Sequence, residues 1–420
     1  MKVCVIGNGG REHALAWRLS ISPSVTKVYA IPGSAAMSDC AELVGIDWQQ
    51  SDHLIRFLKD NHVDLVVVGP EAPLVAGLAD VLNKAGIPVF GPSKAAAQLE
   101  GSKVFAKDLM KKYNIPTAAY GVFHKVDEAK EFIAQTGAPI VVKADGLAAG
   151  KGVVVAMTIE EANAAVEDML SGNRFGDAGS TVVIEEFMEG EEASLLAFVD
   201  GKTVVPMIAS QDHKRIFDGD KGPNTGGMGT YAPAPVLTDA LRDEAMKTIL
   251  EPMVAAMEKE GMPYVGCLYA GLMITSQGPK VVEFNARFGD PETQVVLPLL
   301  DSDLGQIMMA CATGTLTADM VKWKDSSAAC VILASKGYPE TSSKGDVIHG
   351  DIKQHDTTIV FHSGTKLVGD EYVTDGGRVL GVVGLGKDLR TALDRAYGRI
   401  EHIDFEGMQY RTDIGAKAFK

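Results

Sequence analysis

Four short apolar runs, separated by stretches of helical character, divide the first hundred residues of the chain. They are residues 3–6, 28–31, 65–68 and 89–90. Short buried strands that alternate with helices are typical of a parallel sheet covered by helices on both faces. The pattern therefore predicts a doubly wound parallel sheet in an N-terminal α/β domain, residues 1–101.

The length of 420 residues requires further domains, because a single hydrophobic core rarely serves more than about 300 residues. Strands and helices continue through residues 102–325, and we expect a central domain there whose mobile subdomain spans about 118–190. The last segment is β-rich and ends with one amphipathic helix. It predicts an accessory α+β domain over residues 326–420.

Composition excludes several classes of protein. The net charge of −15 argues against a nucleic-acid binder, which needs a basic footprint. The five cysteines form no C-x-x-C pair, so we expect reduced thiols in a cytoplasmic protein. We expect no signal peptide and no membrane span. The histidines lack metal-ligand spacing, which predicts no structural zinc, and the lack of an apolar interface stripe predicts a monomer.

A strand with alternating polar and apolar residues occupies residues 281–288. Alternation places Glu283, Asn285 and Arg287 on one face. The opposite face, which we expect to be buried, carries Val282, Phe284 and Ala286. Two oxygen ligands beside a guanidinium suit Mg²⁺ and a neighbouring anion. An edge strand with a solvated polar face is the alternative for this strand alone, and the other motifs argue against it.

Two polar features follow strands of the N-terminal sheet. Gly9 and Gly10 precede a helix and are expected to offer free amides to one phosphate. Glu12 replaces the third glycine of the dinucleotide fingerprint, so a pyrophosphate fits less well. Glu71 lies at the carboxyl end of a parallel strand and could accept hydrogen bonds from sugar hydroxyls. A tight turn without ligand and a surface acid are the alternatives for these two features.

A glycine-rich loop over residues 146–152 joins two strands and could close its amides over phosphates. Lys143 ends the first of these strands and, with Lys103 and Lys151, predicts a cationic site. The Walker pattern is absent, and a flexible surface hairpin is the alternative. Residues 185–188 follow the next strand and could pair their backbone with an adenine edge.

A second polar segment contains Asp212, His213 and Lys214 and leads into the glycine loop 222–229. An acid, a histidine and two cations, Lys214 and Arg215, beside glycines suggest a substrate pocket. A solvated turn is the alternative for His213 and Lys214. Arg378 could reach the active cleft, although a structural salt bridge is the more common role for a single arginine.

Six motifs closely resemble those of the glycinamide ribonucleotide synthetase family, in the same order: residues 7–13, 69–74, 143–153, 210–215, 222–229 and 283–292. The resemblance spans the whole chain and implies membership of the ATP-grasp superfamily, whose enzymes hold ATP between two α+β subdomains. It implies ATP-dependent ligation of glycine to 5-phosphoribosylamine through a glycyl phosphate, in de novo purine biosynthesis. Another ATP-grasp ligase or a ribonucleotide carboxylase is the alternative.

The resemblance, together with the glycine-rich loops described above, implies roles for individual residues. ATP would contact Lys103, Lys143, Gly150, Lys151, Gly152, Glu185, Glu186, Phe187, Met188 and Glu192. The substrates would contact Gly9, Gly10, Glu71, Asp212, Lys214, Arg287, Gly289 and Asp290. Catalysis would fall to Arg287, Lys143 and Asp212, and Mg²⁺ or Mn²⁺ to Glu283 and Asn285.

One departure from the wider superfamily concerns residues 269–272, which lack the additional acid that many members carry on this strand. A site with two metals held wholly by carboxylates is therefore not expected. Two readings from other classes are a nicotinamide-dependent oxidoreductase and a non-catalytic nucleotide sensor. Glu12 argues against the first, and the polar strand with Glu283 and Arg287 argues against the second.

Overall fold

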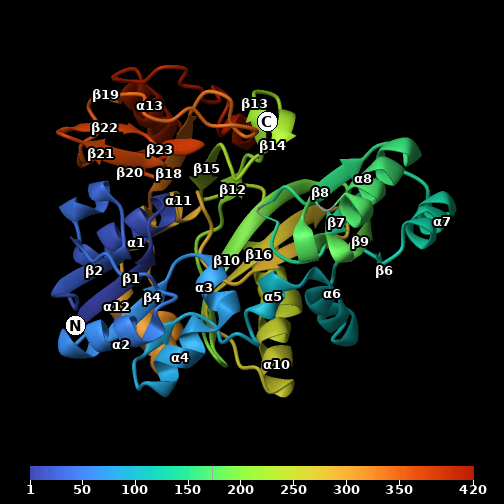
Figure 1. The fold of residues 1–420 in the computed structure, drawn as a ribbon, viewed down its shortest axis with the longest axis horizontal. Coiled ribbons are helices and arrows are strands. Elements are labelled where there is room, and N and C mark those ends of the chain that lie inside the picture. The colour runs from blue at the N-terminus through green and yellow to red at the C-terminus, as the bar shows by residue number, and fades with distance from the viewer. Residues whose placement is uncertain (149, 173) are drawn as a thin grey trace.

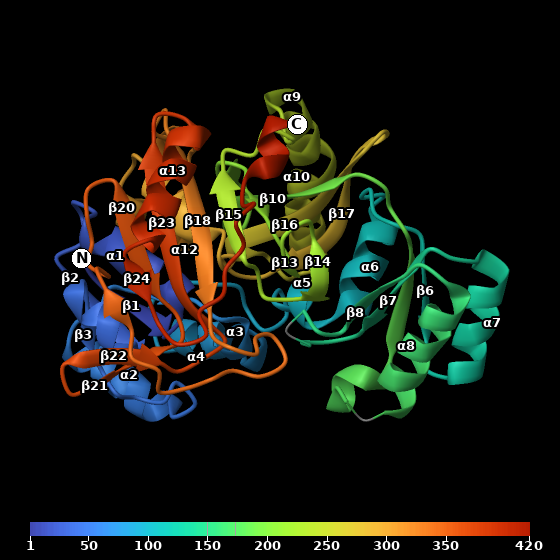
Figure 2. The same cartoon turned by 90° about the horizontal axis from the view of Figure 1, so that it is seen from above.

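The computed structural model describes residues 1–148, 150–172 and 174–420. Figures 1 and 2 show an N-terminal sheet beside a C-terminal sheet, and a smaller central subdomain that stands apart from both. The N-terminal elements are β1 (Lys2–Gly7), α1 (Gly10–Ser20), β2 (Lys27–Pro32), β3 (Glu42–Leu43), α2 (Ser51–Asp60), β4 (Leu65–Val68), α3 (Glu71–Ala76), α4 (Leu78–Lys84) and β5 (Val89–Phe90).

The N-terminal sheet is parallel, with strand order β3-β2-β1-β4-β5. Successive residues of β1 point to opposite faces, so Val3 and Val5 pack with α1 while Cys4 and Ile6 pack with the core that contains α2 and α4. Both faces of the sheet are therefore buried. The predicted doubly wound fold is confirmed.

The central region holds two antiparallel sheets. Its elements are α5 (Gln98–Gly101), α6 (Lys103–Lys112), β6 (Tyr120–Phe123), α7 (Val126–Thr136), β7 (Ile140–Ala144), β8 (Val153–Ala156), α8 (Ile159–Ser171), β9 (Val182–Glu186), β10 (Glu191–Asp200), β11 (Val204–Pro206), α9 (Asp239–Ala245), α10 (Glu251–Lys259), β16 (Val265–Thr275), β17 (Gly278–Asn285), α11 (Thr293–Val296) and α12 (Leu304–Thr313). One sheet has the order β6-β9-β7-β8 and packs on α7 and α8, and the other has the order β11-β10-β16-β17. Figure 2 shows the first sheet with its two helices at one end of the molecule.

A β-bulge interrupts the pairing of β16 with β17. Gly271 pairs with Glu283 and Leu272 with Val281, so Val282 is an extra residue in β17. The expectation that Val282 is buried on the opposite face is wrong, because the bulge brings it to the cleft beside Glu283. Phe284 is buried as expected.

The C-terminal sheet, with order β12-β15-β18-β23-β20, is antiparallel and packs against one long helix. Its region contains β12 (Gln211–Asp212), β13 (Arg215–Phe217), β14 (Lys221–Asn224), β15 (Gly229–Ala232), β18 (Ser327–Ala334), β19 (His349–Gly350), β20 (Thr358–His362), β21 (Thr365–Val368), β22 (Glu371–Thr374), β23 (Arg378–Gly386), α13 (Leu389–Ile400) and β24 (Ile403–Asp404). β12 is an edge strand of this sheet and carries Asp212. Among the described residues, none of the helices is long and apolar enough to cross a membrane.

Candidate functional site

A cleft of about 650 Å³ runs between the N-terminal sheet, the two central sheets and the C-terminal sheet. Most of the side chains predicted to bind ligands line it. They are Glu71, Lys103, Lys143, Gly150, Glu185, Glu192, Asp212, Lys214, Glu283, Asn285, Arg287 and Asp290. Other predicted residues are not part of this lining: Gly9, Gly10, Lys151, Gly152, Glu186, Phe187, Met188 and Gly289.

Two buried lysines flank one buried carboxylate on the ATP-grasp side of the cleft. The Nζ atom of Lys143, at the end of β7, lies 3.0 Å from Glu185 Oε2. The Nζ atom of Lys107, from α6, lies 3.3 Å from Glu185 Oε1. Lys107 was not predicted, although its position four residues after Lys103 on a helix places the two lysines on one face.

Lys103 begins α6 and holds the glycine-rich loop. Its Nζ atom donates to the carbonyl of Gly146 over 2.9 Å, and its backbone amide donates to Asp145 Oδ1 over 2.6 Å. Burial lowers the pKa of Lys103, although nearby acids oppose this effect. Gly152 is buried while Lys151 is exposed, and Ala149 of the same loop lies outside the described residues.

Glu283 and Asn285 present oxygen atoms to the same cleft. Burial would raise the pKa of Glu283, but Lys214, Lys143 and other nearby cations outweigh this effect and lower it. Glu283 is therefore ionised at neutral pH. A carboxylate and an amide oxygen, with room for phosphate oxygens, fit Mg²⁺. Gly271 faces Glu283, and a Cβ atom there would lie 3.3 Å from Glu283 Cγ.

Arg287 lies between two carboxylates. Its guanidinium is 2.8 Å from Glu100 Oε1 and 3.3 Å from Glu71 Oε2. Burial opposes the charged form, but these two acids outweigh it and raise the pKa of Arg287. Glu100, which also accepts from the Ala286 amide over 2.7 Å, had no signal in the sequence. The two ion pairs therefore orient the Arg287 side chain, which lines the cleft.

The loop before α1 differs from expectation. The Gly9 amide donates to Glu12 Oε2 over 2.8 Å, so the expectation that this amide is free is wrong. Glu12 also pairs with Arg11 over 2.7 Å. A Cβ atom on Gly69 would lie 2.2 Å from Glu12 Oε1. The acid that breaks the dinucleotide fingerprint thus fills the space beside the sheet and caps the helix.

The C-terminal domain reaches the cleft through Arg378. Its guanidinium donates to the carbonyls of Gly226 and Asp290, each over 3.0 Å, and lies 3.5 Å from Asp290 Oδ2. Arg378 therefore both forms an ion pair and lines the cleft. Burial acts to raise the pKa of Asp290, but Arg378 and other cations outweigh it and lower the value.

A small pocket of about 20 Å³ adjoins the cleft between Asp212, Lys214, Tyr269 and Glu283. Lys214 Nζ lies 2.9 Å from Asp212 Oδ2. Burial acts against the charge of Lys214, yet Asp212 and other groups raise its pKa well above the ordinary value. His213 is buried, with Nδ1 3.1 Å from the Gly229 carbonyl, so it does not lie in a solvated turn.

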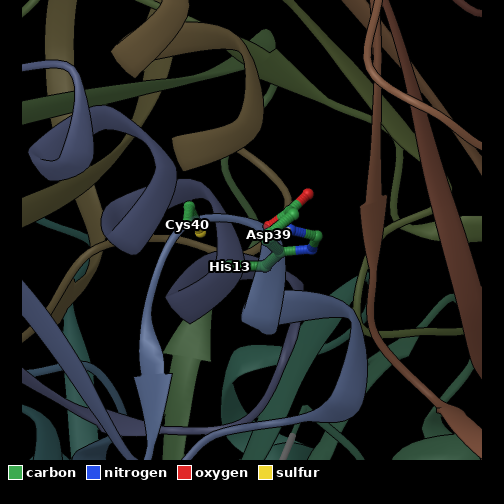
Figure 3. Close-up of side chains that lie close together, drawn as sticks. All are labelled: His13, Asp39 and Cys40. Carbon is green, nitrogen blue, oxygen red and sulfur yellow. Dashed lines mark ion pairs between the residues drawn. The ribbon is translucent and has the colours of Figure 1, made fainter.

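A separate group of potential metal ligands lies at the contact between α1 and β20. His13, Asp39 and Cys40 have potential ligand atoms within 4.8 Å of one another. Figure 3 shows these three side chains close together. However, His13 Nδ1 accepts from the His362 amide over 3.0 Å, which leaves the proton of a neutral ring on Nε2, facing Asp39 at 3.4 Å. That geometry suits a domain contact better than a metal, and the absence of zinc stays a prediction.

Three family models match the chain. They describe the phosphoribosylglycinamide synthetase N domain over residues 1–100, its ATP-grasp (A) domain over 101–293 and its C domain over 328–417. The chain belongs to the phosphoribosylglycinamide synthetase family. The fold class and the family expected from the sequence are confirmed.

Relatives of this chain within the phosphoribosylglycinamide synthetase family are named phosphoribosylamine–glycine ligase. Phosphoribosylamine–glycine ligase of Halalkalibacterium halodurans is 53% identical over 418 residues, covering 100% of this chain and 97% of the relative. The ligase of Rhizobium meliloti is 51% identical, with 100% and 99% covered. The crystal structure of the Thermotoga maritima ligase has 34% identity and a TM-score of 0.86, and covers 99% of this chain and 100% of its own.

The fold of the phosphoribosylglycinamide synthetase family also occurs in more distant proteins. The biotin carboxylase domain of the Hydrogenobacter thermophilus 2-oxoglutarate carboxylase has a TM-score of 0.75 at 16% identity, covering 97% of this chain and 91% of that domain. Its structure contains MgADP and bicarbonate. At this identity the likeness shows the fold alone.

Proposed function

We propose that this chain joins glycine to 5-phosphoribosylamine at the expense of ATP, giving glycinamide ribonucleotide, ADP and phosphate. The observation that carries the proposal is the convergence in one cleft of Lys103, Lys143, Glu283, Asn285 and Arg287. Full-length similarity to phosphoribosylamine–glycine ligases supports the choice of substrates. A carboxylase or another ATP-grasp ligase lacks comparable support.

ATP binds between the two central sheets in this proposal. Lys103 and Lys143 contact its phosphates, and the loop with Gly150, Lys151 and Gly152 closes over them. The adenine and ribose lie against the end of β9, the turn after it and the start of β10, namely Glu185, Glu186, Phe187, Met188 and Glu192. Glu283 and Asn285 would hold Mg²⁺ or Mn²⁺, which when bound offsets the negative charge of the phosphates.

The chemistry needs no protein nucleophile. A carboxylate oxygen of glycine attacks the γ-phosphorus, the bond to the β,γ-bridging oxygen breaks, and ADP leaves. The amine of phosphoribosylamine then attacks the carbonyl carbon of glycyl phosphate, and phosphate leaves. Asp212 accepts the proton that the attacking amine loses. Lys143 offsets the negative charge of the transferred phosphoryl group, and Arg287 stabilises the oxyanion that forms when the amine adds to the carbonyl carbon.

The second half of the cleft holds the substrates. Glu71 and Asp290 accept hydrogen bonds from the ribose, and Lys214 and Arg287 attract anionic groups. Gly9, Gly10 and Gly289 were expected to contact the substrates, but they lie outside the cleft lining. A Cβ atom on Gly10 would meet Ser363, and one on Gly289 would meet Glu292, so we assign these glycines no direct contact with a substrate. We further propose three domains, 1–101, 102–325 with its mobile part at about 118–190, and 326–420, in a cytoplasmic monomer without nucleic-acid or membrane partners.

ADP release is the measurement that tests the proposal. The assay contains Mg-ATP and glycine, with and without phosphoribosylamine formed in place from ribose 5-phosphate and ammonia. Release that needs both co-substrates supports the ligase, while equal release with bicarbonate would reject it. Arg287→Ala should lower kcat far more than ATP affinity, since Arg287 acts on the developing anion. An equal collapse of ATP affinity would reject that role.

A further inference from the structure

Lys107 is a buried cation beside the cleft to which the proposed chemistry gives no role. It lies in α6 with only 2% of its surface exposed. Its ammonium lies 2.7 Å from Thr117 Oγ1, 3.3 Å from the Ala118 carbonyl and 3.3 Å from Glu185 Oε1. An ammonium has three N–H donors, so these contacts account for all of them. Lys107 therefore has no donor left for a ligand.

Glu185 connects this lysine to the phosphate site. While Oε1 faces Lys107, Oε2 lies 3.0 Å from Lys143 Nζ. Lys143 also donates to the Val282 carbonyl over 3.1 Å. Two of its three N–H groups are thus occupied, and the third remains for a ligand in the cleft that Lys143 lines.

We propose that Lys107 is a positioning residue for ATP, which holds Glu185 so that Lys143 keeps a free donor and an uncompensated positive charge for the phosphates. The inference rests on the proposed ATP site. Two lysines and one carboxylate carry one net positive charge. If Lys107 were neutral, Glu185 and Lys143 would form a neutral pair, and the attraction for phosphate would fall.

Lys107 also connects segments that are distant in the sequence. Thr117 and Ala118 lie in the segment between α6 and β6, and Glu185 lies in β9 of the small sheet. Thr117 donates in turn to the Val281 carbonyl over 2.7 Å. The Lys107 ammonium therefore fixes β9, and with it Glu185, against β17, the strand that carries Glu283.

The charge of Lys107 can change near neutral pH. Burial lowers its pKa to about 8, against the opposing effect of Glu185. The groups that face it are Glu185 and Glu186 from β9, Lys143 from β7 and the Tyr120 ring of β6 at 5.7 Å. Bound phosphate favours the protonated form. Nucleotide affinity should therefore fall as the pH rises through about 8.

The test measures ADP affinity calorimetrically, with Mg²⁺ and without co-substrates, from pH 6.5 to 9.5. If nucleotide raises the Lys107 pKa by about one unit, affinity of the unmodified protein falls about tenfold across this range. Lys107→Met should bind ADP about tenfold more weakly at pH 7 and show no such fall. Lys107→Arg keeps its positive charge at every pH in this range. The ADP affinity of this variant should therefore not decrease as the pH rises.

The matched control is Lys111→Met, one helical turn further along α6 at an exposed position, which should follow the unmodified protein. A purely structural role would lower the stability of Lys107→Met but would leave the pH dependence of Lys107→Arg unchanged, and that result would overturn the proposal. If Lys107→Met fails to fold, Lys107→Arg decides. Failed ADP release with glycine and phosphoribosylamine would reject the ligase while this binding result still stands.

Discussion

The guanidinium of Arg287 lies 2.8 Å from the Glu100 carboxylate, and this ion pair joins the segment after β17 to helix α5. Both side chains are largely buried, with 17% and 7% of their surfaces exposed. Glu100 also accepts from the backbone amide of Ala286. The pair therefore orients Arg287 in the cleft that it lines together with the proposed metal ligands.

Glu100→Gln should reduce turnover and stability together. The amide can still accept from the Ala286 backbone, but Arg287 loses one of its two charged partners. We expect a loss of about 2 kcal/mol, less than the ~3–5 kcal/mol for a buried charge left alone, because Glu71 remains. Urea denaturation and kcat check this. Glu71→Gln, whose side chain is 31% exposed, is the comparison and should cost less stability.

Gly69→Ala should destabilise the N-terminal sheet. Its Cβ atom would lie 2.2 Å from Glu12 Oε1, which would displace the carboxylate that caps α1 through the Gly9 amide. We expect a loss of about 1–3 kcal/mol, typical of an overpacked site, measured by thermal unfolding. Gly45→Ala is the control, because the space around its Cβ atom is open to 4 Å. Equal stability of the two variants would contradict this explanation.

Arg378→Met should impair the amine substrate rather than ATP. The guanidinium neutralises Asp290 and holds the Gly226 carbonyl, both on the substrate side of the cleft. We expect the KM for phosphoribosylamine to rise about tenfold, as for loss of one charged hydrogen bond, with the KM for ATP unchanged. Steady-state kinetics with each substrate varied in turn measure the difference. A matching rise for ATP would place Arg378 in the nucleotide site instead.

Two buried histidines, His213 and His362, should make the free energy of unfolding decrease as the pH falls. Burial lowers the pKa of His213 to about 4 and that of His362 to about 3. In the unfolded chain a histidine has a pKa of about 6.5. Between that pH and about 4, the two imidazoles are therefore protonated to a greater extent in the unfolded state than in the folded state. Stability from these groups is complete above pH 6.5 and decreases as the pH falls.

His213→Gln removes one of these protons, so the slope of unfolding free energy against pH between 6.5 and 4 should shrink by up to about 1.4 kcal/mol per pH unit. Urea denaturation at several pH values measures the slope. The exposed His53 provides the control, and His53→Gln should keep the slope of the unmodified protein. An unchanged slope in His213→Gln would show that this histidine accepts a proton in the folded state.

The sequence by itself determined the elements and the chemistry of the cleft. Parallel strands buried on both faces read as continuous apolar runs, which is why residues 3–6 and 65–68 predicted the N-terminal sheet. Alternation along β17 predicted that Glu283 and Asn285 share a face. These signals are local, because side-chain direction repeats with a fixed period along a strand.

The ion-pair partners of the buried charged side chains were decided only by the tertiary structure. Lys107 and Glu100 acquire their roles from Glu185 and Arg287, partners that lie far away in the chain. The bulge at Val282 depends on the register of β17 against β16, which no single strand specifies. Burial strengthens interactions between charges and penalises those left unpaired. Such partners are selected by the packing of the domains, and a linear pattern does not contain that information.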